Sequence, residues 1–307
     1  MTERARDLVS SPAGAALLCE LGGVDVLGTT GVPGDVLRWL AELDERLVAA
    51  VRDWSPPELS PRSLLEELYE VVEGLAFGRF DEWHRLATLS AGMWDPLLPV
   101  ARSLISSVAA SWWWNPRGSE QFWVRAADAP APAADGRLPT RSDGVPDHDD
   151  VWWVQPPVGP ATSRQPPGDA LPVAAVCPDW HERRGPRVEM WSVRAVPDAR
   201  VFEVRGPDDW IELVRAHPRR VSADHAEWRE WTGWAGDWIV VDWSAVARDW
   251  AGVHVTVGGW VTAAHRLLLV PGGATVLAGW NPDETVWLRE PPVAVRKIAE
   301  AELPPGA

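Results

Sequence analysis

The spacing of apolar residues changes between the two halves of this chain. Between Glu3 and about Ala110, apolar residues recur at three- and four-residue steps, as in Val36–Val51, and this spacing is typical of amphipathic helices. From Val188 onward, apolar and polar residues alternate in short runs such as Val201–Val204, which indicates strands. We therefore expect an α+β (or mixed α/β) fold, with an N-terminal helical bundle followed by a mixed sheet with packed helices.

A segment of different composition separates these halves. Residues 126 to about 170 are rich in Pro, Ala, Gly and Asp, and only Val151–Val154 has the pattern of a strand. Such a composition favours extended linker or loop. We predict a helical domain over residues 1–125, a linker with a short strand over 126–187, and an α/β domain over 188–307.

Local signals mark two helix starts. Ser60 and Pro61 precede a helical pattern, with serine as the cap and proline in the first turn. Pro207 is followed by two aspartates, and acids in a first turn favour a helix because they complement its dipole.

The charge balance argues against a nucleic-acid partner. The 307 residues include 44 acidic and 29 basic side chains, for a formal net charge of −15, whereas phosphate binding rests on clustered arginine and lysine. Two short basic clusters, His181–Arg187 and Arg215–Arg220, are better interpreted as solvated turns.

The sequence predicts a cytoplasmic protein. Met1–Asp7 lacks a signal-peptide pattern, and no apolar stretch approaches the roughly 20 residues that cross a bilayer. We therefore expect no membrane partner. Cys19 and Cys177 lie far apart and belong to no Cys-x-x-Cys pair, so we expect free thiols.

Tryptophan dominates the aromatic residues, with 22 indoles against one tyrosine and four phenylalanines. The chain also has a single lysine, Lys297, among its 29 basic residues, and this bias is typical of a GC-rich, actinomycete genome. Indole suits stacking on flat or cationic ligands, but it suits ordinary cores equally well.

Four segments carry a resemblance to other proteins. They are Trp112–Pro116, Val201–Trp210, Trp250–Thr256 and Ala278–Leu288. These segments resemble a group of uncharacterised, Trp-rich actinobacterial proteins. The resemblance implies a shared domain and an actinobacterial source, but it assigns no catalytic residue.

Three residues are candidates for catalysis. In an alternating strand, His254 and Thr256 share one face, and a histidine beside a hydroxyl and a carboxylate can perform acid–base chemistry. Glu284 follows an Asn-Pro-Asp turn between tryptophans and is a candidate base or counter-ion. A structural histidine and an ordinary β-turn with core indoles explain the same residues, and the sequence favours those alternatives.

Five residues are candidates for an aromatic ligand-binding wall. His225, Trp228 and Trp231 belong to a short helical pattern, and Trp260 and Trp280 lie near the candidate strands. Such indoles can line a pocket with a histidine that orients the ligand, although core packing explains them as well.

Metal and cofactor motifs are missing from the sequence. The seven histidines are scattered, and no Gly-x-Gly-x-x-Gly, Walker loop or Gly-x-Ser-x-Gly pattern occurs. We therefore expect no metal and no cofactor.

Three hypotheses on function remain open. The first is an enzyme or binding protein for a small molecule, with a Trp-lined cleft in the C-terminal domain. The second is a non-catalytic interaction, immunity or regulatory factor whose indoles bury a protein partner. The third is group transfer from a charged carrier such as an aminoacyl-tRNA.

Overall fold

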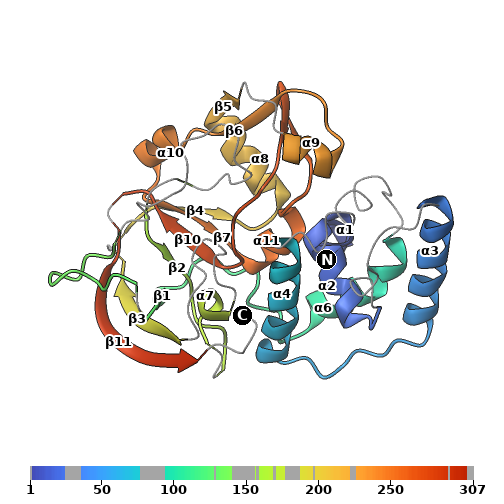
Figure 1. Cartoon of the computed structure of the whole chain (residues 1–307), viewed down its shortest axis with the longest axis horizontal. Helices are drawn as coiled ribbons and strands as arrows, with labels where there is room; N and C mark the ends of the chain where they lie inside the picture. Colours follow the sequence, from blue (N-terminus) through green and yellow to red (C-terminus); the bar gives the residue numbers. More distant parts are fainter. Residues whose placement is uncertain are drawn as a thin grey trace.

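The protein has an α+β fold (Figure 1). The structure is a computed structural model that describes residues 2–24, 36–76, 94–127, 129–139, 156, 159–168, 171–176, 187–195, 198–221, 226–289 and 291–302. Within these residues the helices lead into three mixed or antiparallel sheets, which confirms the predicted fold class.

Helices make up the first part of the chain. They are α1 (Thr2–Ser10), α2 (Pro12–Leu21), α3 (Val36–Arg52), α4 (Pro61–Ala76), the 3-10 turn η1 (Asp95–Leu97) and α6 (Leu98–Ser106). The predicted start at Ser60 and Pro61 is confirmed, because α4 begins at Pro61 and the Ser60 hydroxyl accepts the Ser63 N–H at 3.0 Å.

Three sheets and further helices follow. Sheet A has the order β1 (Gln121–Ala126), β3 (Arg187–Arg194), β11 (Val293–Glu302). Sheet B has the order β2 (Ala161–Thr162), β10 (Glu284–Trp287), β7 (Gly252–Val255), β4 (Val201–Val204). Sheet C has the order β5 (Pro218–Val221), β6 (Trp238–Val241), β9 (Gly273–Thr275), β8 (Leu268–Val270). The helices are α7 (Val173–Val176), α8 (Pro207–Ala216), α9 (Ala226–Thr232), α10 (Trp243–Asp249) and α11 (Val257–Ala263).

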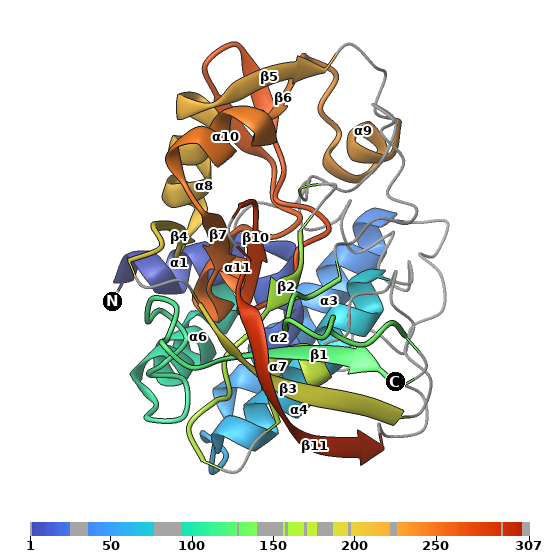
Figure 2. The ribbon, with the colours of Figure 1, turned by 90° about the vertical axis from the view of Figure 1, so that its left-hand side faces the viewer.

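Sheet B lies between sheets A and C (Figures 1 and 2). Its strands β4 and β7 are parallel, whereas β10 runs antiparallel to both β7 and β2. Two helices begin at strand ends of this region: α8 starts at Pro207, as predicted, and α11 starts after Thr256, whose hydroxyl accepts the Gly259 N–H. Sheet B is therefore the element around which the rest of the second half is arranged.

One apolar core joins the N-terminal helices to the C-terminal half. Helices α1 and α2 pack against α11, and the Ser11 hydroxyl donates to the Ala264 carbonyl at 3.3 Å. A Cβ on Gly14 would lie 2.5 Å from the Val261 carbonyl oxygen, so the two helices touch backbone to backbone. The boundaries of the predicted domains stay predictions, but the described parts on either side share this core.

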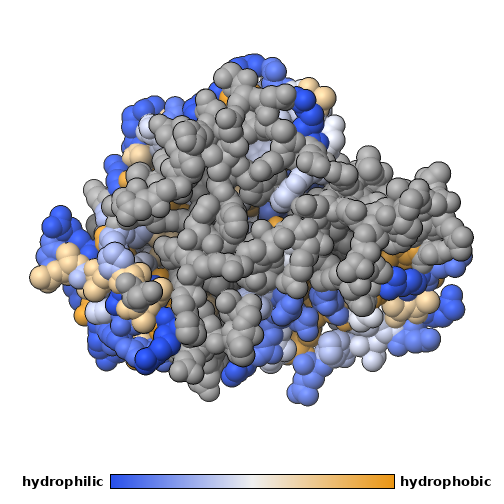
Figure 3. Space-filling view, in the orientation of Figure 1, coloured by the Kyte–Doolittle hydropathy of each residue, from blue (hydrophilic) through white to orange (hydrophobic). Residues whose placement is uncertain are grey.

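Most of the indoles serve this core. Trp113, Trp210, Trp228 and Trp260 belong to it and are among the largest fully buried side chains. In the face drawn in Figure 3, hydrophilic residues predominate among the described residues at the rim of the molecule.

Among the described residues, no helix combines the length and the apolar character that crossing a bilayer requires. Cys19 is a buried, free thiol.

We expect Gly259→Ala to lower the free energy of unfolding by ~1–3 kcal/mol or more, as overpacking does. A Cβ at this position would lie 2.1 Å from the Val204 carbonyl oxygen, a backbone atom that cannot move aside without shifting β4. Alanine is otherwise the better helix former, so any loss is steric. Urea denaturation measures the effect, and Gly118→Ala is the control, because its Cβ would meet nothing closer than 3.7 Å. Equal stability of the two variants would contradict the close contact.

Candidate functional site

A row of polar residues crosses sheet B from edge to edge. Glu203 on β4 is directly opposite His254 on β7, His254 is opposite Thr285 on β10, and Thr285 is opposite Thr162 on β2. Residues directly opposite one another project from the same face of a sheet, so all four side chains share one face. We call them the polar row.

Apart from Glu284 at the start of β10, the other face of sheet B is apolar. Val204, Val253, Val255 and Val286 alternate with the polar row and belong to the main core. This alternation explains why the strands form here, because β-branched residues pack well on a pleated, buried surface. It also fixes the register, because a slip of one residue would place the polar row in the apolar core.

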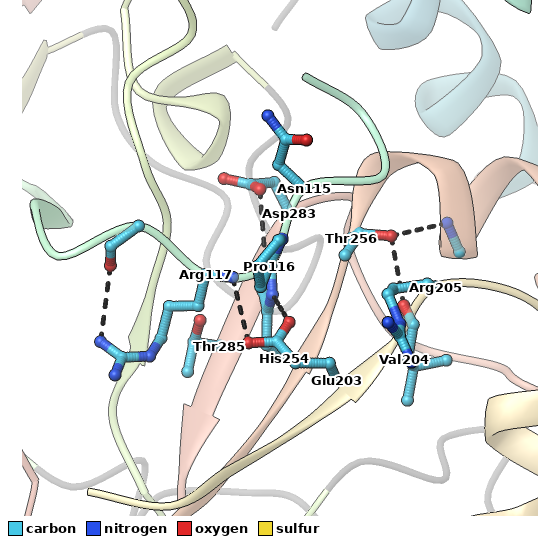
Figure 4. A network of polar contacts seen from close by, with 12 residues as sticks. Asn115, Pro116, Arg117, Glu203, Val204, Arg205, His254, Thr256, Asp283 and Thr285 are labelled. Carbon is cyan, nitrogen blue, oxygen red and sulfur yellow. Dashed lines mark hydrogen bonds and ion pairs between the residues drawn. The ribbon is translucent and has the colours of Figure 1, made fainter. Parts of the chain in front are cut away.

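His254 is held between two carboxylates (Figure 4). Its side chain is 0% exposed, its Nδ1 lies 2.6 Å from Glu203 Oε2, and its Nε2 lies 3.3 Å from Asp283 Oδ1. Because a carboxylate accepts and does not donate, this arrangement fits an imidazolium ring that donates from both nitrogens.

Asp283 is fixed by an arginine from a distant part of the chain. Arg164 Nε lies 2.5 Å from Asp283 Oδ1, and the Arg164 backbone N–H donates to Oδ2 at 2.9 Å. Asp283 itself has a φ of 58°, a left-handed conformation that aspartate tolerates better than most residues. The turn before β10 thereby directs this carboxylate toward His254.

The segment around Pro116 contacts the residues on the polar face of sheet B. Arg164 donates to the carbonyl oxygens of Asn115 and Pro116 at 3.1 and 3.3 Å, and its guanidinium lies 5.1 Å from the Trp112 ring centroid. The Arg117 backbone N–H donates to Glu203 Oε1 at 3.0 Å. The segment 112–117 therefore contacts both Glu203, on one side of His254, and Arg164, which pairs with Asp283 on the other side.

We call Glu203, His254, Asp283 and Arg164 the charged network. With the imidazole protonated, it contains two negative and two positive groups, so their charges cancel. The pKa of His254 is raised from its ordinary 6.5: burial, the largest single influence, lowers it, but the hydrogen bonds and charges of Asp283 and Glu203 together outweigh burial. Such a buried arrangement is costly unless it is complete, because each charge has lost its hydration.

The predicted catalytic residues do not converge. His254 lies at the centre of the charged network, but Thr256 caps α11 and donates its hydroxyl to the Val204 carbonyl at 3.2 Å. Glu284 is opposite Val255, on the other face of sheet B, where its carboxylate accepts the Asn281 N–H at 2.9 Å. The structure thus brings Asp283, not Glu284, to the histidine.

The predicted ligand-binding indoles contact other aromatic rings and the backbone inside the protein. Trp228 meets Trp238 edge to face with centroids 5.1 Å apart, and Trp231 stacks on His265 at 5.9 Å. Trp260 donates to the Trp280 carbonyl at 2.6 Å. Of the four predicted indoles only Trp231 is half-buried, and the others are buried. His225 lies outside the described residues.

Three residues of the charged network were not singled out from the sequence. Glu203 carries a usable signal, because it is a charged residue in an otherwise apolar strand, whereas the Asn-Pro-Asp pattern at Asp283 indicates only a turn. Arg164 lies in the segment predicted to be a linker and has no local signal. Among the residues that the structure describes, no group of three or more His, Cys, Asp and Glu side chains is arranged to hold a metal.

The four segments that carry the resemblance meet at the charged network. They supply the Asn115 and Pro116 carbonyls, Glu203, His254 and Asp283, and only Arg164 comes from elsewhere. Comparison with protein families, curated proteins and solved structures finds no match to this chain. The resemblance therefore stays a prediction, and the site must be interpreted from its own geometry.

We expect Asp283→Asn to lower the free energy of unfolding by ~3–5 kcal/mol, the cost of removing one partner from a buried ion pair. The substitution leaves Arg164 and His254 facing an amide in place of a charge, while asparagine still tolerates the left-handed backbone. Urea denaturation measures the loss. Glu300→Gln is the control, because it breaks ion pairs that lie at the surface, and a similar effect of both variants would contradict the structure.

We expect the network to become less stabilising as pH rises. The pKa of His254 is higher in the folded protein than its ordinary 6.5, so its contribution is complete below pH 6.5 and disappears as pH rises through the folded-state pKa. As pH rises from 6.5 through the folded-state pKa, the wild type should lose stability relative to His254→Gln. Denaturation curves at several pH values measure this difference. Parallel pH profiles of the two proteins would contradict a charged His254.

Proposed function

We propose that the protein is an enzyme or binding protein for a small molecule, with the charged network as its centre. Glu203 is the residue that meets the ligand, and His254, Asp283 and Arg164 hold Glu203 in place and set its charge. This proposal keeps the functional class that the sequence favoured but replaces the tryptophan wall by a polar site.

The graded exposure of the charged network supports this proposal. The side chains of His254 and Asp283 are 0% exposed and that of Arg164 is 11% exposed, whereas that of Glu203 is 22% exposed. A ligand arriving from solvent therefore reaches Glu203 before any other member. A carboxylate has about four acceptor positions, and the Arg117 N–H and the His254 ring occupy one on each oxygen.

The chemistry that this arrangement permits is proton transfer. Glu203 can accept a proton from a hydroxyl or ammonium group of a ligand, as a general base does. The protonated His254 can donate its Nδ1 proton to Glu203 and, once neutral, take it back, while Asp283 keeps the ring in a fixed orientation, the role that a buried aspartate has in catalytic triads. Burial of the ring strengthens each of these interactions, because the surroundings screen charge poorly.

A second candidate function is supported by the edge of sheet A. Strand β11 is an edge strand, and Val295 and Ile298, at its two irregularities, are 50% and 37% exposed. Exposed apolar side chains on an edge strand are a common surface for a protein partner, which suits the interaction hypothesis. The hypothesis of group transfer from a charged carrier has less support, because the arginines of the two basic clusters lie on different sheets. Arg187 on sheet A pairs with Glu300, whereas Arg220 on sheet C pairs with Asp237.

We expect Glu203→Gln to weaken ligand binding about 10- to 100-fold, the effect of losing a hydrogen bond to a charged group. Intrinsic tryptophan fluorescence and thermal melting, read against a panel of small amines, carboxylates, phosphates, nucleosides and sugars, identify a binding compound. The matched control is Glu212→Gln, an exposed acid on α8, which should bind the same compound as the wild type does.

Glu284→Gln separates the two assignments of the site. If Glu284 were the ligand-facing acid, this variant would lose binding and Glu203→Gln would not. A compound that binds equally well to the wild type and to Glu203→Gln would contradict the proposal. Binding only to a protein fraction, abolished by Val295→Asp in β11, would favour the second candidate function.

A further inference from the structure

The Arg117 side chain occupies an unusual position beside the charged network. Its backbone N–H points toward Glu203, whereas its guanidinium extends away from that carboxylate (Figure 4). The guanidinium lies 5.2 Å from the ring centroid of Trp287. Arg117 is half-buried, so its charge is partly removed from water.

The ring beneath Arg117 is rigidly held. Trp287 is 1% exposed, and its Nε1 donates to Thr162 Oγ1 at 3.0 Å. Trp287 lies two residues after Thr285 on β10, so it projects from the same face as the polar row. Opposite Trp287 on β7 stands Gly252, which has no side chain to cover the ring. The stacked guanidinium is therefore positioned on the polar face of sheet B.

Arg117 has no carboxylate partner among the described residues. Its guanidinium contacts the Gly118 carbonyl at 3.5 Å, a long distance for a hydrogen bond. The chain has 44 acids for 29 bases, and other partly or fully buried arginines, such as Arg125 and Arg164, each pair with an acid. Burial lowers the pKa of Arg117, and the charge of Glu203 opposes that shift, yet a guanidinium stays protonated in proteins.

We propose that Arg117 is an anion-binding subsite that receives a carboxylate or phosphate group of the ligand. A planar guanidinium stacked on an indole presents its remaining N–H donors as a fork, which matches two oxygens of such a group. The inference rests on the proposed function and deepens it: the ligand carries an anionic group for Arg117 and a hydroxyl or ammonium donor for Glu203. Small hydroxy acids, amino acids and phosphorylated alcohols share this chemistry.

The test uses the full chain labelled with ¹⁵N at its tryptophan indoles. The Trp287 signal is assigned with Trp287→Phe, and sodium acetate and inorganic phosphate are titrated separately against chloride at constant ionic strength. We expect a saturable shift of the Trp287 signal with at least one of these anions. The two titrations show whether the subsite prefers a carboxylate or a phosphate.

Variants of Arg117 decide whether the shift comes from this subsite. Arg117→Lys keeps the charge but loses the planar fork, so binding should weaken about tenfold, and Arg117→Gln should weaken it about 10- to 100-fold. Both variants keep the backbone N–H that holds Glu203, and thermal melting confirms that they fold. The matched control is Arg200→Gln, which removes a guanidinium stacked on Trp250 at an exposed position and should leave the titration unchanged.

Two outcomes would overturn the inference. One is a Trp287 signal that neither anion shifts, and the other is an unchanged titration in Arg117→Gln. A compound from the panel that needs Glu203 but binds Arg117→Gln as tightly as the wild type would also overturn the subsite while leaving the proposed function intact.

Discussion

The contact of one buried imidazole with two carboxylates determines how this part of the molecule is built. His254 joins β7 to β4 through Glu203 and to the turn before β10 through Asp283. Arg164 then connects Asp283 to the segment at Asn115 and Pro116. Each of these charges is acceptable inside the protein only because the next one compensates it. Segments far apart in the sequence must therefore come together as a unit.

The indoles provide the surroundings in which this charged network operates. Trp112 lies under Arg164, and Trp113 and Trp114 continue the run into the core. The Nε1 atoms of all three have no hydrogen-bond partner among the described residues, an arrangement that costs ~1–3 kcal/mol for each buried donor. Apolar packing of the rings must exceed this cost. The tryptophan content thus supplies a closely packed apolar shell beside a polar centre.

Local features could be predicted from the sequence, but contacts between distant segments could not. The starts of α4 at Pro61 and α8 at Pro207 follow from capping rules that involve only neighbouring residues. His254 was recognised as a candidate because alternation is local as well. To identify Asp283 rather than Glu284 as the partner of His254, one needs the register of β10 against β7, because a shift of one residue moves a side chain to the other face of the sheet. Arg164 requires a contact across 119 positions, which no local pattern reveals.

The protonation state of His254 tests the account most directly. A ¹H–¹⁵N correlation spectrum of the histidine side chains, assigned with His254→Gln and followed from mildly acidic to mildly alkaline pH, reports each ring nitrogen separately. The account predicts that both nitrogens of His254 carry protons above the pH at which an ordinary histidine becomes neutral, and that Asp283→Asn abolishes this behaviour. A neutral ring with one bare nitrogen at pH 7 in the wild type would contradict it.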